Sequence, residues 1–202
     1  MAFAGIRGEL GIPRFEFFHT LKGAEFKKVF VRDLDRCLYH RGLRGLSRDI
    51  PETAQVLRTL MKESGATQIT FTGNSKGGYA AILFGAMLDV DRVHAFSPQT
   101  FIDLRNRLKY GETRNLRLVL PFYLQSLFLP KFYDLSNSLN RLSFKTAIHI
   151  HYGLDGAVDQ RHAEHLQGIR GVVLHPYELG KSELMKHLRD SGELARILMG
   201  EG

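Results

Sequence analysis

The most constraining feature of the sequence is a glycine-flanked serine between a β-rich run and an apolar run. Residues 68–72 (QITFT) are typical of a buried strand. Residues 77–88 (GGYAAILFGAML) are apolar on nearly every side, as expected of a helix buried in the centre of a protein. The residues between them, 73–77 (GNSKG), match the pattern G-x-S-x-G. A strand that turns directly into a buried helix predicts an α/β protein with Ser75 at the tip of the turn.

The rest of the chain alternates between strand-like and helix-like segments. This alternation predicts a mostly parallel sheet of about six strands with helices on both faces. Pro51 opens one helix and Gly65 closes it, since proline suits the first turn and glycine the left-handed residue after the last. A terminal helix is expected over residues 182–199, with a kink near Gly192. The predicted strands are residues 1–4, 28–32, 68–72, 93–96, 146–152 and 172–175.

The length of the chain predicts one domain, residues 1–202, because 202 residues suit a single sizeable core. Residues 97–143 show no strand pattern, yet they are too rich in aliphatic and aromatic side chains for a linker. We therefore expect a lid or insertion around residues 100–143, over the edge of the sheet where an α/β protein holds its site.

Composition and charge exclude several other classes of protein. No stretch approaches the roughly 20 apolar residues of a membrane-spanning helix. The basic residues that give a net charge of +7 are scattered and accompany no nucleic-acid-binding motif. The single cysteine, Cys37, excludes an internal disulfide and suits a reducing compartment. We therefore expect a cytoplasmic protein that acts on a small molecule, with no nucleic-acid partner and no membrane span.

The turn at residues 73–77 suits nucleophilic chemistry for three reasons. The strained turn would present the Ser75 hydroxyl, and the glycines at its two ends would leave room for the neighbouring strand and helix. The start of the helix would direct N–H groups and a positive dipole at an oxyanion. A chance Gly-Ser turn is the alternative, but the strand before it and the buried helix after it favour a nucleophile.

Two longer segments carry a resemblance, namely 71–85 (FTGNSKGGYAAILFG) and 94–103 (HAFSPQTFID). They resemble a bacterial, serine-esterase-like branch of the α/β-hydrolase superfamily, and shorter segments near both ends extend the likeness over nearly the whole chain. The resemblance implies a three-layer α/β-hydrolase-type fold in which the superfamily's first two strands have no counterpart. The fold would then be trimmed at the N-terminus, or the chain would be a fragment of a longer protein. It implies no particular substrate, since one fold hosts many reactions.

The resemblance also implies which groups surround Ser75. The backbone N–H groups of Lys76 and Ile6 would form the oxyanion hole. The acid would follow the fifth strand, where Asp159 and Asp155 are both available. Asp159 fits better, because the residues after it match the branch's Asp-x-x-His-Ala pattern. The other aspartate would then cap a helix.

The expected catalytic histidine is missing from its usual place. Similar proteins carry it at the start of the last helix, but Ser182 occupies that position here and suits a helix N-cap. We expect His187, five positions along the same helix, to be a displaced base. His175 in the preceding strand is the alternative, and loss of the base is the third possibility. Each histidine would equally suit a purely structural role.

Two other patterns are weak. His149 and His151 share one face of a strand, but no third ligand stands at a suitable spacing for a metal. Residues 180–182 (GKS) resemble the end of a P-loop, but the glycine required five residues earlier is His175. We therefore expect no metal and no cofactor.

These observations predict a serine hydrolase that acts on a carboxylic ester or related acyl bond. Ser75, His187 and Asp159 would be its catalytic residues. A catalytically impaired α/β-hydrolase-fold binding or interaction domain and an acyltransferase are the alternatives. The acyl group, the alcohol and the oligomeric state are not indicated by the sequence.

Overall fold

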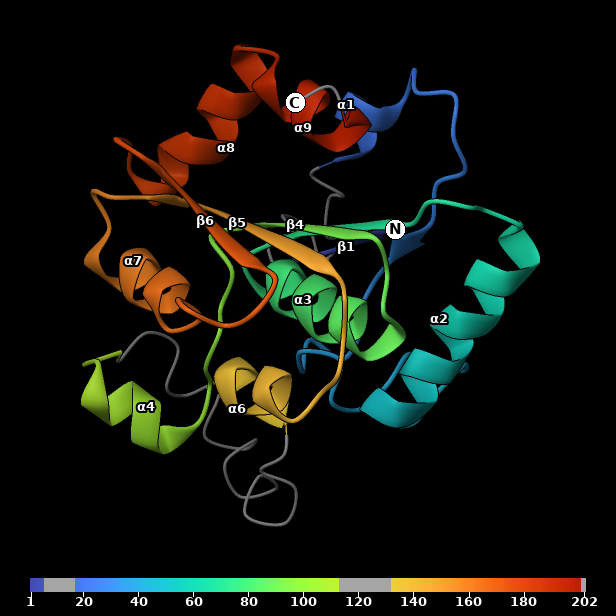
Figure 1. Ribbon diagram of the computed structural model, residues 1–202, viewed down its shortest axis with the longest axis horizontal. Coiled ribbons are helices and arrows are strands. Elements are labelled where there is room, and N and C mark those ends of the chain that lie inside the picture. The colour runs from blue at the N-terminus through green and yellow to red at the C-terminus, as the bar shows by residue number, and fades with distance from the viewer. Residues whose placement is uncertain (6–16, 113–131, 201–202) are drawn as a thin grey trace.

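The computed structural model describes residues 1–5, 17–112 and 132–200, and these form a sheet between two layers of helices (Figure 1). Every pair of neighbouring strands is parallel. The predicted fold class is therefore confirmed, and the sheet is parallel throughout rather than mostly so. In order across the sheet, the six strands are β2 (Phe30–Val31), β1 (Ala2–Phe3), β3 (Thr70–Asn74), β4 (Arg92–Phe96), β5 (Ala147–Gly153) and β6 (Val172–Tyr177).

Helices cover both faces of this sheet. On one face lie α1 (Phe18–Leu21), α8 (Lys181–Asp190) and α9 (Glu193–Met199) (Figure 1). On the other face lie α2 (Ile50–Ser64), α3 (Lys76–Leu88), α4 (Leu104–Lys109), α6 (Leu135–Asn140) and α7 (Ala157–Glu164). The lid expected around residues 100–143 falls partly outside the described residues. Its described parts hold α4 and α6, and an antiparallel bridge joins Phe101 to Asp134.

The local signals in the sequence placed most elements well. The predicted strands all have counterparts, with ends shifted by up to about two residues. In α2, Asp49 caps the helix by accepting a hydrogen bond from the Glu52 N–H at 2.8 Å. Gly65 ends the helix in the left-handed conformation, with φ of 63°. These caps explain why the interval between Pro51 and Gly65 could be assigned from residue types alone.

Helix α3 is buried along nearly its whole length and forms the centre of the larger core. Its side chains are apolar on every side, so it is stable only where other elements surround it. Phe84 on α3 stacks on Phe3 of β1 with ring centroids 5.8 Å apart, and Phe3 contacts the edge of Phe71 on β3 at 5.2 Å. The helix that follows Ser75 therefore sits directly against the central strands.

The C-terminal region differs from the single kinked helix that the sequence predicted. Gly192 has φ of 76°, a left-handed conformation that cannot continue an α-helix, so the chain forms two separate helices, α8 and α9. Both helices bury leucines against the sheet, where they pack with Phe96 and Ala2. The buried leucines are Leu184, Leu188, Leu194 and Leu198.

The sheet face under α8 and α9 carries four histidines. The register places His94 of β4 beside His149 of β5, and His151 of β5 beside His175 of β6. The rings of each pair stack, with centroids 5.0 and 4.7 Å apart. His149 Nδ1 also lies 3.0 Å from His175 Nε2. Imidazole rings thus occupy positions that aliphatic side chains usually fill.

One chain of hydrogen bonds runs through this face and indicates which ring nitrogen of His151 and of His94 carries the proton. Tyr177 donates its hydroxyl proton to Glu193 on α9 at 3.0 Å, so its oxygen accepts from His151 Nδ1–H at 3.2 Å. Because burial keeps the His151 ring neutral, its Nε2 then accepts from His94 Nδ1–H, also at 3.2 Å. Both imidazoles are therefore neutral, and the chain ties α9 to the middle of the sheet.

Burial makes these histidines hard to protonate in the folded protein. It lowers the pKa of His94 to about 3 and that of His151 to about 2. Neighbouring imidazoles lower both pKa values further, and Arg92 lowers that of His94. Burial likewise lowers the pKa values of His149 and His175. In the unfolded chain each would take up a proton near pH 6.5. Acid therefore favours the unfolded chain.

We predict that the free energy of unfolding is greatest above pH 6.5 and falls steeply as the pH drops toward 4. Each buried histidine adds about 1.4 kcal/mol per pH unit to the slope. His94→Gln should reduce the slope between pH 4 and 6 by about that amount, as measured by urea unfolding at several pH values. Gln55→Met, at an exposed position of α2, is the control and should keep the wild-type slope. Equal slopes for all three proteins would contradict the prediction.

Candidate functional site

A single residue makes the turn between β3 and α3. Ser75 has φ of 54° and ψ of −112°, a conformation that costs a non-glycine residue about 1–3 kcal/mol. Three main-chain hydrogen bonds hold it there. Its N–H donates to the Phe96 carbonyl at 2.9 Å, and its carbonyl accepts from the N–H groups of Tyr79 at 3.1 Å and Gln99 at 3.2 Å. The strained conformation is thus fixed by β4, by α3 and by the turn after β4.

The glycines around Ser75 are required by close main-chain contacts. A Cβ atom on Gly73 would lie 2.2 Å from the carbonyl carbon of Gly77, and one on Gly77 would lie 2.2 Å from the Phe3 oxygen. A Cβ on Gly78 would lie 2.9 Å from that of Pro98. The glycines thus make room for the neighbouring strand and helix, as the G-x-S-x-G pattern predicts.

We predict that Gly73→Ala destabilises the protein by about 2–3 kcal/mol, because main-chain atoms cannot move aside as a flexible side chain would. Chemical denaturation measures the change. Gly23→Ala is a matched control, since a Cβ atom there would meet nothing within 4 Å. Its stability should stay within about 1 kcal/mol of the wild type. A Gly73→Ala protein as stable as this control would show that the close contact relaxes freely.

The start of α3 supplies main-chain donors beside Ser75. The N–H groups of the first helical residues have no acceptor within the helix, and the helix dipole adds positive charge there. Lys76 is the first of these residues, and Ile6, the other expected donor, lies outside the described residues. Burial is the main cause that lowers the pKa of the Lys76 side chain; Asp33 opposes the shift and Arg107 adds to it. The surroundings of Ser75 therefore suit a negative charge.

Both candidate acids follow β5, at the edge of the sheet where Ser75 also lies. Asp159 stands in the first turn of α7 and is only 2% exposed, whereas Asp155 is exposed in the preceding turn. Parallel strands end at the same edge, so the position after β5 is compatible with a role near Ser75. The choice of Asp159 remains a prediction.

The structure brings no histidine to the Ser75 hydroxyl. All nine histidines lie among the described residues, and none of them forms a hydrogen bond with that hydroxyl. His187 is exposed near the end of α8, where its side chain has no hydrogen-bond partner among the described residues. His175 is held in β6 by His149. His187 as the base therefore stays a prediction.

Position 182, where similar proteins carry the histidine, is the second residue of α8. The chain just before it passes close to the end of β5, because a Cβ on Gly153 would lie 2.0 Å from the Leu179 oxygen. The start of α8 is therefore held near the strand that precedes both candidate acids. Position 182 therefore lies in the first turn of this helix, where the resemblance places the base.

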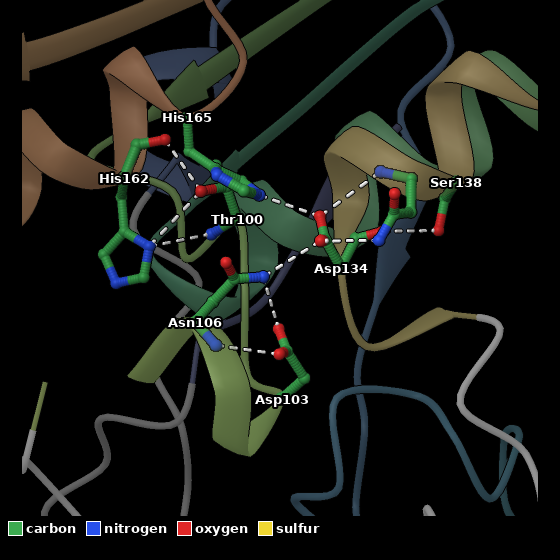
Figure 2. A network of polar contacts seen from close by, with 8 residues as sticks. Thr100, Asp103, Asn106, Asp134, Ser138, His162 and His165 are labelled. Carbon is green, nitrogen blue, oxygen red and sulfur yellow. Dashed lines mark hydrogen bonds and ion pairs between the residues drawn. The ribbon is translucent and has the colours of Figure 1, made fainter. Parts of the chain in front are cut away.

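A polar network anchors α7 to the segment after β4, as Figure 2 shows. The Thr100 N–H donates to His162 Nδ1 at 3.2 Å, and the Thr100 hydroxyl donates to the His162 carbonyl at 2.7 Å. His162 is buried against Phe101, with ring centroids 4.1 Å apart, and its Nε2 lies 3.7 Å from Glu112. These contacts fix the helix that carries Asp159.

Asp134 is the hub of the rest of this network, where it binds side chains from three helices (Figure 2). Its carboxylate accepts hydrogen bonds from the side chains of His165 at 2.8 Å, Asn106 at 2.9 Å and Asn137 at 2.8 Å, and so links α7, α4 and α6. Burial would raise the pKa of Asp134, but these hydrogen bonds outweigh it and lower the pKa. The stability that Asp134 contributes is therefore present above about pH 3.9 and lost as the pH falls further.

We predict that Asp134→Asn lowers the free energy of unfolding at pH 7 by about 2–3 kcal/mol, because an amide directs two donors at partners that are themselves donors. Urea unfolding measures the loss. Asp103→Asn is the matched control: Asp103 also caps a helix and binds Asn106, but it is less buried. Its loss should stay near 1 kcal/mol. Equal losses for the two variants would contradict a hub role for Asp134.

The comparisons with known proteins rest on structure alone. No protein-family model and no curated protein match the sequence. The capsule O-acetyltransferase of Neisseria meningitidis serogroup A superposes with a TM-score of 0.71 and 17% identity, over 96% of this chain and 84% of that one. Acetyl xylan esterase 1 from Thermoanaerobacterium sp. gives a TM-score of 0.55 and 20% identity, over 76% and 52%.

An α/β-hydrolase enzyme from the metagenome of Mar Chica lagoon sediments gives a TM-score of 0.50 and 18% identity, over 75% of this chain and 69% of that one. The chain has an α/β-hydrolase-type fold. At these identities the likeness establishes the fold and leaves the reaction to be argued from the site.

The described residues add two negative findings. They hold no group of three or more side chains arranged to bind a metal ion. None of their helices is long and apolar enough to span a membrane. No functional role was predicted from the sequence for Asp134, Ser97 or Gln99. A signal existed for the last two, since a polar Ser-Pro-Gln-Thr run directly follows the apolar strand β4.

Proposed function

We propose that the protein catalyses acyl-group chemistry at Ser75, either hydrolysing a carboxylic ester or transferring its acyl group. The observation that supports this most is the strained conformation of Ser75, held by main-chain bonds and made possible by Gly73 and Gly77. Strain of this kind is retained where it serves a function, because a relaxed turn would be more stable.

In the proposed reaction, the Ser75 oxygen attacks the acyl carbonyl carbon, and its proton passes by way of a base to the departing alcohol. The negative charge on the carbonyl oxygen is stabilised by the Lys76 N–H and the positive end of α3. Water or another hydroxyl compound then attacks the acyl-serine. The new C–O bond forms as the bond to Ser75 breaks, and the incoming proton returns to the serine oxygen.

The acyl group that we propose is acetyl. Two proteins of the same fold are named as a capsule O-acetyltransferase and an acetyl xylan esterase. A mutant of the capsule enzyme has been solved in complex with CoA. Both names describe acetyl chemistry, one by transfer and one by cleavage, so acetyl esters are the first substrates to test and CoA thioesters the second.

A catalytically impaired binding or interaction domain is the second candidate function. The observation that favours it is the lack of any histidine hydrogen bond to the Ser75 hydroxyl. Without a base, a serine hydroxyl is a weak nucleophile near neutral pH. The two candidates differ in whether Ser75 reacts, which can be measured directly.

We predict that a fluorophosphonate probe labels wild-type protein at Ser75 and does not label Ser75→Ala. Labelling requires a serine hydroxyl of raised reactivity, which the strained turn and the adjacent donors would provide. Mass spectrometry of the labelled peptide identifies the site. Ser143→Ala, at an exposed position, is the control and should label like the wild type. A folded wild-type protein that stays unlabelled would favour the impaired-domain function.

We also predict that Ser182→His raises the rate of p-nitrophenyl acetate hydrolysis by about 100-fold or more, the range that a positioned general base contributes. Ser182→Ala is the control and should leave the rate unchanged. Combining Ser182→His with Ser75→Ala should abolish the gain. If a folded Ser182→His protein shows no increase in rate, there are two explanations. An active wild type would mean that another group already serves as the base. An inactive wild type would mean that position 182 is not the place of the base.

A further inference from the structure

The turn after β4 runs beside the nucleophile residue, because the Gln99 N–H donates to the Ser75 carbonyl at 3.2 Å. We infer that Gln99 and Ser97 bind an uncharged hydroxyl or amide group of the substrate beside Ser75. This inference rests on the proposed function, because it names the substrate class of the same site. It assigns a substrate-binding role to residues that the reaction itself does not require.

The first evidence is that both side chains are buried and that one oxygen atom of each has no hydrogen-bond partner among the described residues. Ser97 is 2% exposed and Gln99 is 9% exposed. The Ser97 Oγ and the Gln99 Oε1 have no hydrogen-bond partner among the residues that the structure describes. Buried polar atoms in folded proteins are nearly always paired, and an exception calls for a ligand or a functional reason.

The second evidence is that the main chain around these side chains is clamped on three sides. The Ser97 N–H donates to the His151 carbonyl of β5 at 2.7 Å, and the Gln99 N–H donates to Ser75 itself at 3.2 Å. Thr100, the next residue, is fixed to His162 of α7. Ser97 also has φ of 39°, a left-handed conformation that a serine rarely takes. The turn is thus held rigidly with its two oxygen atoms unsatisfied, as a preorganised binding site would be.

The chemistry of the two atoms defines the class of ligand. The Gln99 Oε1 only accepts hydrogen bonds, whereas the Ser97 hydroxyl both donates and accepts. Neither side chain is charged, so their natural partner is a neutral group that carries its own O–H or N–H. A sugar offers several hydroxyls, and an N-acetylated sugar adds an amide N–H. We therefore place a sugar-like, neutral part of the substrate against this turn.

Stability separates a binding role from a structural one. Gln99→Met keeps the shape of the side chain and removes its unpaired oxygen, and Ser97→Ala removes the other. Because neither oxygen is hydrogen-bonded to any described residue, both variants should melt at or above the wild-type temperature. Gln55→Met, at an exposed position of α2, is the matched control. A clear loss of melting temperature in Gln99→Met and Ser97→Ala, but not in the control, would overturn the inference.

Binding tests the inference directly, with methyl glucoside and N-acetylglucosamine as probes in saturation-transfer NMR. We expect the wild type and Gln55→Met to bind at least one sugar, and Gln99→Met to bind it at least tenfold more weakly. Labelling of Ser75 by the fluorophosphonate should persist in Gln99→Met. Failure of the wild type to bind either sugar, or equal binding by Gln99→Met, would overturn the inference.

The same two measurements distinguish this inference from the proposed function. Sugar binding without labelling of wild-type Ser75 would remove the acyl chemistry and leave the binding site. Labelling of Ser75 without sugar binding would remove the binding site and leave the acyl chemistry. Loss of labelling in Gln99→Met would show that Gln99 acts by positioning Ser75 and not by binding substrate, and would also overturn the inference.

Discussion

The contact between the first turn of α3 and the end of β1 governs how the rest of the molecule assembles. Gly77 lies so close to the Phe3 oxygen that only a residue without a side chain fits. This approach lets an entirely apolar helix lie against the central strands, where Phe84 stacks on Phe3. Beside this contact the chain passes from β3 into α3 through one residue, Ser75. The core and the strained turn therefore meet at this contact.

Much of this arrangement could be predicted because it depends on local signals. The G-x-S-x-G turn, the apolar helix after it and the caps of α2 are each written in a few adjacent residues. The six strands followed from apolar runs between turn residues. The break at Gly192 was underestimated because a glycine within a helical pattern is often tolerated, and only its left-handed conformation shows that two helices form.

The polar interior was far less predictable, because its partners lie far apart in the sequence. Asp134 meets Asn106 and His165 from two other helices, and nothing in the residues around Asp134 announces such partners. The alternation of His149 and His151 was visible, but a pair of histidines on one strand cannot show that His94 and His175 lie beside them. The position of a general base is a similar long-range question, so the sequence analysis could only name candidates.

The histidine-rich face of the sheet also affects how activity measurements must be interpreted. Enzymologists commonly assign a catalytic imidazole from a loss of rate between pH 7 and 5. In this protein the same interval coincides with proton uptake by the unfolded chain at His94 and His151, neither of which forms a hydrogen bond with the Ser75 hydroxyl. A sigmoidal rate profile would thus appear even in a protein that has no histidine at its reaction centre. Only rates normalised to the folded fraction at each pH can reveal what takes the serine's proton.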